Sequence, residues 1–376
     1  MASLHVLSKW KLPFLGIHLS LFPPLSLRNG NGITKRDSIF QFVFLTHPIS
    51  ISPDSIGFIS TEFCVIKASD HTALSKSILK TLLYFDIFQY PLTASEILNH
   101  LPTNHVTLDH ITEELTRMKS QSIIYALSDF FSVQNNPMLG NRRIKGNLMA
   151  LKSLSLAKKQ ALFISKFPFV RAVMASGSLS KNYMDELSDL DFFIITKPNR
   201  LWIARMLLRF YQKVFLLNSH KYFCINYFVD EDHLEIEEKN LYTATELATL
   251  IPLYGKEYYT QLLRANEWTK IYLPNNTLRS TENVLNNRSS WLKQQTEAMI
   301  NILGATRFEN LSRRAFTSRW RKRYQNNYSK EDFEVAFKAK KHVSKGHPNN
   351  YQKKVLDLYH EKLGEFGSKM SIRWND

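Results

Sequence analysis

Apolar residues between residues 72 and 88 recur at the three- and four-residue spacing of an amphipathic helix. Two shorter helices are expected next, because Thr93 and Glu96 have the spacing of a capping box and Thr107 can cap the segment that follows it. The stretch SIIYALSDFFSV is β-branched and aromatic with a polar break, which is typical of a two-stranded hairpin. The pattern therefore predicts three helices followed by a hairpin.

This succession resembles a winged helix-turn-helix domain, which we assign to residues 69–148. The helix that would read DNA carries three acidic side chains beside two basic ones: Asp109, Glu113, Glu114, Arg117 and Lys119. Such a helix face is poorly suited to contact phosphates. A packing or dimerisation module is therefore favoured over DNA binding, and the basic run at residues 141–145 is expected to lie in a solvated turn.

The next domain is predicted over residues 149–268, where apolar strands alternate with amphipathic helices. Strands are expected at residues 170–175, 189–196 and 222–229, and helices at 149–166, 199–217, 243–250 and 257–268. Pro252 and Gly255 are expected to end the third of these helices. The predicted fold class is α+β, with a mixed sheet flanked by helices.

Residues 269–376 are predicted to form a basic, mostly helical C-terminal region. A polar break at residues 344–348 precedes a final helix that is expected to begin near residue 350. Basic and aromatic side chains interleave at residues 319–324, a pattern that suits a strand of nucleic acid, with cations along the backbone and rings stacked on bases. A solvated helical face with long basic side chains is an equally good interpretation.

Residues 1–68 differ from the rest, because they are rich in Pro, Ser and Phe, poor in acids and without sustained periodicity. We interpret them as a poorly structured extension and hypothesise that the functional protein begins near Ala73. The longest apolar run in this segment is interrupted by Pro13 and His18 and is shorter than the roughly 20 residues that a spanning helix needs. The sequence therefore predicts neither a transmembrane segment nor a membrane partner.

Composition narrows the choice of compartment and partner. The chain has 376 residues, of which 44% are apolar, enough for ordinary folded cores. Its only two cysteines, Cys64 and Cys224, allow neither a disulfide framework nor a CxxC metal knuckle, which favours a cytoplasmic location. Of the net charge of +16, the last 108 residues supply +11, with 21 Lys and Arg against 10 Asp and Glu. Such basicity favours polyanionic partners.

The candidate chemistry lies between residues 170 and 196. Ser176, Gly177 and Ser178 follow a predicted strand as a tight turn into a helix, where backbone N–H groups can approach a phosphate closely. Asp189 and Asp191 then begin a second apolar strand at a spacing that places both carboxylates on one face. Two carboxylates beside a phosphate-binding turn suit Mg²⁺ bound together with nucleotide phosphates.

Gly177 and Ser178, then nine residues, then Ser188-Asp189-Leu190-Asp191 and an apolar run resemble the signature of the DNA polymerase beta-like nucleotidyltransferase superfamily. The resemblance covers residues 170–255. It implies that Gly177 and Ser178 hold the β- and γ-phosphates of a nucleoside triphosphate, with ATP as the default donor. It also implies that Asp189 and Asp191 are the catalytic residues and bind magnesium.

The sequence departs from that family at the third carboxylate, which members usually carry on a following strand. Asn226 stands there, and an amide can ligate a cation but cannot act as a base. Asn226 and Glu235 are therefore the candidates to complete the metal shell, with Asp230 as a further alternative. Lys181 is the expected phosphate contact, whereas Arg200, Arg205 and Arg209 are expected to lie on a solvated helix face.

These patterns predict an enzyme that transfers a nucleoside monophosphate to a hydroxyl acceptor, which could be a small molecule, a protein or RNA. Two alternatives stay open: a catalytically inactive nucleotide-binding regulator, and a nucleic-acid-binding protein that uses its basic C-terminal region. On the acceptor side, the resemblance suggests Glu246, Tyr254, Asn266 and Trp268, although simple helix packing is the favoured interpretation of each.

Overall fold

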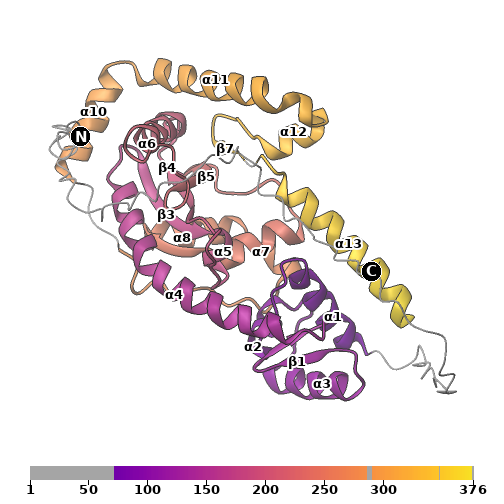
Figure 1. The fold of residues 1–376 in the computed structure, drawn as a ribbon. Coiled ribbons are helices and arrows are strands. Elements are labelled where there is room, and N and C mark those ends of the chain that lie inside the picture. The colour runs from indigo at the N-terminus through magenta and orange to yellow at the C-terminus, as the bar shows by residue number, and fades with distance from the viewer. Residues whose placement is uncertain (1–71, 286–289, 347, 375–376) are drawn as a thin grey trace, which may run out of the picture. The chain divides into compact units, whose positions relative to one another are not determined.

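The computed structural model describes residues 72–285, 290–346 and 348–374, all of which belong to one compact unit, residues 68–376. The extension that we expected at residues 1–68 lies outside the described residues, so that prediction stays a prediction. The described chain combines a small N-terminal group of helices, a central sheet and a C-terminal series of helices (Figure 1). No helix in these ranges is both long and apolar enough to cross a lipid bilayer.

The N-terminal elements follow the predicted order. They are α1 (Ala73–Asp86), α2 (Ala94–His100), α3 (Leu108–Ser120), β1 (Tyr125–Leu127) and β2 (Phe130–Ser132). A threonine caps each of the three helices: Thr72, Thr93 and Thr107. The side-chain oxygen of each accepts a hydrogen bond from the backbone N–H three residues further along the chain. The two strands pair antiparallel. The three helices and the hairpin are thus confirmed.

Helix α4 (Pro137–Ser165) begins twelve residues before the predicted start at residue 149. Asn136 caps it and Pro137 occupies its first turn, where the missing N–H costs nothing. The expectation of a solvated turn at residues 141–145 is therefore wrong, because these residues form helix. The boundary that we expected between residues 148 and 149 falls inside this continuous helix.

The central sheet has five strands in the order β6-β3-β4-β5-β7. Their bounds are β3 (Val170–Ser176), β4 (Asp191–Thr196), β5 (Cys224–Asp230), β6 (Ile251–Tyr254) and β7 (Val343–Lys345). Strands β4 and β5 run parallel and every other neighbouring pair runs antiparallel, so the sheet is mixed, as predicted. The short helix α5 (Gly177–Ser180) follows β3 directly.

Both edge strands were missed by the sequence pattern. Residues 251–254 were interpreted as a helix end because of Pro252 and Gly255, but they form β6, where Pro is tolerated because an edge strand leaves one row of N–H groups unpaired. Residues 343–345 form β7, which overlaps the polar break predicted at residues 344–348 in a mostly helical region. A three-residue strand is too short to show a period of two.

Helices cover both faces of the sheet. One face packs against α4 and α6 (Leu201–Phe215), with Val173, Phe192 and Phe228 in the shared core. The opposite face packs against α7 (Leu241–Thr249) and α8 (Lys256–Ala265), with Met174, Phe193 and Ile195 in the core. Alternate residues of each strand thus enter different cores, as the pleat requires.

The remaining helices are α9 (Thr269–Tyr272), α10 (Trp291–Ile302), α11 (Ala305–Tyr324), α12 (Lys330–Ala336) and α13 (Tyr351–Met370), with the 3₁₀ turn η2 (Gln325–Asn327) after α11. Helix α11 packs along α6, and α13 packs against α1 and α7 (Figure 1). Trp320 contacts Trp202, and Tyr324 stacks on Phe337 with ring centroids 4.9 Å apart. Both rings are half-buried in these contacts, and the expectation that they stack on bases stays a prediction.

Candidate functional site

The end of β3 and the start of β4 bring Gly177 against Asp191. Ser176 and Asp191 are register partners, and the chain turns into α5 at Gly177 with a φ of +64°. A Cβ at this position would lie 2.4 Å from Oδ2 of Asp191, closer than any real contact. Glycine is therefore required here twice, for its left-handed backbone and for the space that the carboxylate occupies.

Asn226 reaches the same carboxylate from the other side, through an irregularity in β5. Phe192 pairs with Ile225, and the next residue, Phe193, pairs with Tyr227. Asn226 is therefore an extra, unpaired residue in an otherwise regular parallel ladder. Its Nδ2 donates to Oδ1 of Asp191 at 2.9 Å and to Sγ of Cys224 at 3.0 Å. Bulges often redirect a side chain beside a functional site, and this one aims Asn226 at Asp191.

Lys181 lies at the same turn. Its Nζ forms an ion pair of 2.8 Å with Oε1 of Glu246 on α7 and donates to the carbonyl of Gly177 at 3.3 Å. The structure thus brings together Gly177, Lys181, Asp191 and Asn226, four of the seven predicted site residues. Glu246, which the resemblance suggested on the acceptor side, lies beside them through its ion pair with Lys181. Ser178 stands in α5 beside Gly177, and its hydroxyl has no hydrogen bond with any described residue.

The pKa of the Asp191 carboxyl is raised from its usual value to about 6, chiefly by burial and in smaller part by the nearby carboxylates of Asp189 and Glu246. A hydrogen bond with Cys224 and the charge of Lys181 act in the opposite direction. The charges of Asp189 and Glu246 thus both reach Asp191, and a cation placed beside Asp191 would favour its ionised form.

Asp189 precedes β4 and lies in the loop that leads into it, so only Asp191 is part of the strand. Its charge acts on Asp191, on the Cys224 thiol and on the imidazole of His220. His220 also feels the guanidinium of Arg209, and its Nδ1 is 3.9 Å from Sγ of Cys224. Sequence reasoning missed His220, because a single histidine in a loop gives no signal before the loop is placed.

Glu235 is not part of the site. Strands β4 and β5 run parallel, with Asp191 opposite Cys224 at one end and Thr196 opposite Asp230 at the other. Glu235 follows the far end, and its carboxylate pairs with Lys239 at 2.6 Å. Five residues of strand separate the two ends by roughly 16 Å. Glu235 and Asp230 therefore cannot complete a shell around a metal at Asp191.

The donors at this end of the sheet suit a hard cation only in part. Asp189 and Asp191 supply carboxylate oxygens, the ligands that Mg²⁺ prefers. Asn226 presents its amide nitrogen to Asp191, so it orients a carboxylate and does not offer an oxygen in this arrangement. Over the described residues no three His, Cys, Asp or Glu side chains gather as a metal-binding group. Two carboxylates with nucleotide oxygens and water completing the shell remain a chemically sound fit.

Two of the expected acceptor-side residues have structural roles instead. Asn266 is fully buried, and its side-chain amide bonds the backbone of Leu234, Ile236 and Leu262. Trp268 donates from its indole to Asn266. Helix packing, the favoured interpretation, accounts for both.

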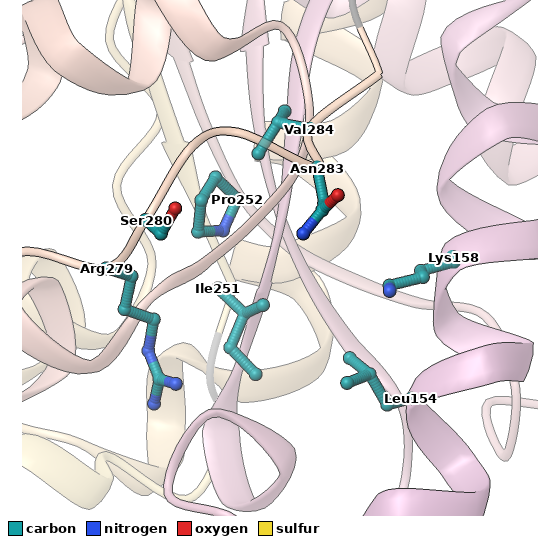
Figure 2. A pocket seen from close by; sticks show the side chains of 8 residues that line it. All are labelled: Leu154, Lys158, Ile251, Pro252, Arg279, Ser280, Asn283 and Val284. Atoms are coloured by element: carbon teal, nitrogen blue, oxygen red, sulfur yellow. The ribbon is translucent and has the colours of Figure 1, made fainter.

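A cavity of about 350 Å³ opens beside β6, and Figure 2 shows the side chains that line it. Ile251 and Pro252 of the edge strand face Leu154 and Lys158 of α4 across it. Arg279 lines this cavity and also a second one, of about 220 Å³, which Lys181 borders. The guanidinium of Arg279 donates to the carbonyl of Ser180 at 2.6 Å. The first cavity therefore adjoins the backbone of α5, the short helix that begins at Gly177.

We compared the chain with known proteins. No family model, no curated protein sequence and no solved structure matches it.

Proposed function

We propose that the protein transfers a nucleoside monophosphate from a nucleoside triphosphate, ATP by default, to a hydroxyl acceptor, in a magnesium-dependent reaction. The observation that carries the proposal is the contact of Gly177 with Asp191 at the joined ends of β3 and β4. It sets an open backbone turn, a carboxylate and the cation of Lys181 side by side, which is what a metal-bound triphosphate requires.

In this proposal Gly177, Ser178 and Lys181 hold the β- and γ-phosphates, and Asp189 and Asp191 hold Mg²⁺. When bound, the metal neutralises phosphate charge and lowers the pKa of the attacking hydroxyl. The acceptor oxygen forms a bond to the α-phosphorus, the bond from that phosphorus to pyrophosphate breaks, and pyrophosphate leaves with the electron pair. The hydroxyl proton passes to water, since the amide of Asn226 cannot accept it.

The chain contributes mainly by positioning. Asn226 holds Oδ1 of Asp191 through its amide N–H, and Gly177 leaves Oδ2 uncovered by any Cβ. Fixed geometry of this kind lowers a barrier by supplying orientation before the reaction begins. The negative charges of Asp189 and Glu246 act against the ionised form of Asp191, and Mg²⁺ bound at Asp191 would offset them.

We further infer that the N-terminal three-helix and hairpin group is a winged-helix-like packing module. The charges on α3 support this: Glu114 pairs with Arg117 at 2.7 Å, and Asp109 and Glu113 are exposed. A cytoplasmic location is part of the proposal and is supported by Cys224, a free and buried thiol.

The test measures binding and transfer separately. Calorimetry with Mg·ATP is followed by transfer from α-labelled ATP to a panel of hydroxyl acceptors. Asp189→Asn and Asp191→Asn should each reduce metal-dependent transfer to background while the proteins stay folded, because one carboxylate cannot hold the cation alone. Full transfer activity in either variant would refute the assignment. Asp185→Asn, a nearby carboxylate held by Ser188 and backbone N–H groups, is the matched control.

A second candidate function is a nucleotide-binding regulator without catalysis, which the amide at Asn226 favours. If Mg·ATP binds but no acceptor is modified, and Asn226→Asp does not create activity, the regulator is the better proposal. Gain of transfer in Asn226→Asp would instead identify a site that lacks only the third carboxylate.

A further inference from the structure

Arg205 on α6 is a buried cation without an acidic partner. Only 5% of the residue is exposed, and its Nε and Nη1 have no hydrogen-bond partner among the described residues. Its guanidinium lies over three rings, those of Phe228, Phe316 and Trp320, at 4.9, 5.5 and 5.3 Å from their centroids. The expectation of a solvated position is wrong for this residue. Aromatic faces attract the charge but cannot accept its in-plane N–H groups.

Two more arginines adjoin it. Arg209, one helical turn further along α6, repels Arg205, and Arg319 on α11 repels Arg209, so that each lowers the pKa of its neighbour in addition to the effect of burial. Arg209 is half-buried and donates to the amide of Gln212, whereas Arg319 is exposed. Within the described ranges no carboxylate forms an ion pair with any of the three. We call Arg205, Arg209 and Arg319 the arginine cluster.

The cluster adjoins the β5 side of the candidate site. Both Arg205 and Arg209 are close enough to Cys224 to interact with it electrostatically, and Cys224 is the register partner of Asp191. Gly346 links the two regions as well: its N–H donates to the carbonyl of Asn226 at 3.3 Å, and a Cβ on it would lie 3.4 Å from Nη2 of Arg205.

The order of the strands places the donor and the acceptor of the proposed reaction on different sides of β4. Strand β4 carries Asp191 and lies between β3, which ends at Ser176 directly before Gly177, and β5, which begins at Cys224. In the proposed reaction the donor phosphates lie on the β3 side, at Gly177 and Lys181. An in-line displacement brings the attacking oxygen from the side opposite the leaving pyrophosphate, which is the β5 side, where the arginine cluster lies.

We propose that the arginine cluster binds a phosphate group of the acceptor, so that the acceptor is a phosphorylated molecule with a hydroxyl close to its phosphate. The assignment of this phosphate to the acceptor rests on the proposed function, whereas the binding of a phosphate by the cluster does not. A tetrahedral dianion matches several guanidinium donors better than a single carboxylate does. The phosphate could belong to the terminal nucleotide of a polynucleotide or to a small phosphorylated alcohol, and the test distinguishes these sources.

The experiment measures binding without donor or metal, so that it stays independent of transfer. Three probes are titrated into the full chain: a short oligoadenylate with a free 3′-hydroxyl, glycerol 3-phosphate, and glycerol as the uncharged match. The unsubstituted protein should bind at least one phosphorylated probe and not glycerol. Arg209→Gln and Arg319→Gln should each weaken that binding about tenfold, the usual effect of losing one charge-assisted hydrogen bond. Tighter binding of the oligoadenylate identifies a polynucleotide acceptor.

The control is Arg314→Gln, which removes the same charge from an exposed position of α11 and should leave binding unchanged. Arg205→Met is informative only if it folds, and for that reason the test relies on Arg209 and Arg319. Failure of both phosphorylated probes to bind overturns the proposal, as does wild-type binding in both cluster variants. A loss of Mg·ATP binding in the cluster variants, with probe binding intact, would assign the cluster to the donor and overturn it too. Failure of Asp191→Asn to affect transfer would refute the proposed function but leave these binding results standing.

Discussion

Gly177 combines a left-handed backbone with a contact that excludes any side chain, so its replacement has two separable effects. In Gly177→Ala the backbone alone should cost about 1 kcal/mol in the free energy of unfolding. The added Cβ must also displace the Asp191 carboxylate, from which it would lie 2.4 Å away. We therefore expect loss of Mg·ATP binding as well as lower stability, measured by calorimetry and by urea unfolding.

Gly304 provides the control for that substitution. Its φ is +92°, and a Cβ there would meet nothing within 4 Å. Gly304→Ala should therefore lose a similar amount of stability and keep nucleotide binding. Equal binding in the two variants would show that Asp191 does not need its place beside Gly177.

His100 should make the stability depend on pH. Burial lowers the pKa of its imidazole to about 4; Glu96 acts against this, and Lys181 and Arg279 add to it. Between pH 4 and 6.5 the unfolded chain then binds more protons than the folded one, so the free energy of unfolding rises with pH in this window. The contribution of His100 should be about 2 kcal/mol lower at pH 5 than at pH 7.5.

The measurement for His100 is urea unfolding at those two pH values for the unsubstituted protein and for His100→Phe, which keeps a ring against Phe85. The difference between the pH values should shrink by about 2 kcal/mol in the variant, because phenylalanine does not titrate. His360→Phe, at an exposed position of α13, should leave the difference unchanged. An unaltered pH dependence in His100→Phe would contradict the prediction.

At the scale of elements, α4 is joined to the N-terminal helices by an ion pair whose cation is buried and whose carboxylate is partly exposed. Arg143 has 1% of its side chain exposed, pairs with Glu96 of α2 at 2.6 Å and lies 3.8 Å over the ring of Tyr90. Arg143→Met removes the buried ends of this ion pair and of the hydrogen bond to the carbonyl of Pro91, while the Glu96 carboxylate that it leaves is 28% exposed and can be hydrated. The substitution should lower the free energy of unfolding by about 2 kcal/mol in denaturant titrations.

The neighbouring Arg142 is the matched control for Arg143. Its nearest carboxylate contact, with Asp185, is 3.9 Å long and partly exposed. Arg142→Met should therefore cost less than about 1 kcal/mol. Similar losses in the two variants would mean that the ion pair of Arg143 does not hold α2 against α4.

The elements that the sequence predicted well are those whose signals are local. Thr72, Thr93 and Thr107 mark helix starts because a hydroxyl that caps a helix acts only three residues away. Strands β6 and β7 were missed because their pairing partners, β3 and β5, are distant in sequence, and an edge strand can carry Pro252. The long helix α4 was cut short because its buried residues include Arg143, which a hydropathy pattern scores as exposed.

At the scale of the whole molecule, the positive charge of the C-terminal region defines a test of nucleic-acid binding. Arg321, Lys322 and Arg323 are exposed on α11, while Trp320 and Tyr324 are engaged in packing. Binding to single-stranded RNA through this face would be electrostatic and weaken steeply with salt. Replacing the three cations with Gln should reduce the slope of log K against log salt by about 2.

The matched variant removes three exposed lysines of α4, Lys152, Lys158 and Lys159, and so changes the net charge equally on another helix. It should leave most of the slope intact. Equal effects in the two triple variants would indicate attraction to the net charge of the protein, without a binding face on α11.

The candidate site could be predicted from sequence only along one stretch of chain. Gly177, Lys181, Asp189 and Asp191 lie within fifteen residues of one another, so their spacing alone suggested a shared site. His220 and the arginine cluster reach it from other elements, and nothing in their local sequence marks them. Glu246 was suggested only by the resemblance, as an acceptor-side residue, and its ion pair with Lys181 could not be predicted. Glu235 was misplaced because strand polarity, which sets the end of the sheet that a residue occupies, cannot be read from composition.

Strand β7 is synthesised late, so the sheet is completed only when this strand has been translated. Residues 227–229 of β5 pair with residues 343–345, which leave the ribosome more than a hundred residues later. The backbone groups along that edge of β5 therefore lack these hydrogen-bond partners until then. Until then a nascent chain would present an open strand edge beside the parallel β4, the kind of template on which neighbouring chains aggregate. We expect newly made protein to depend on chaperones during this interval, and chains truncated before residue 343 to accumulate as aggregates.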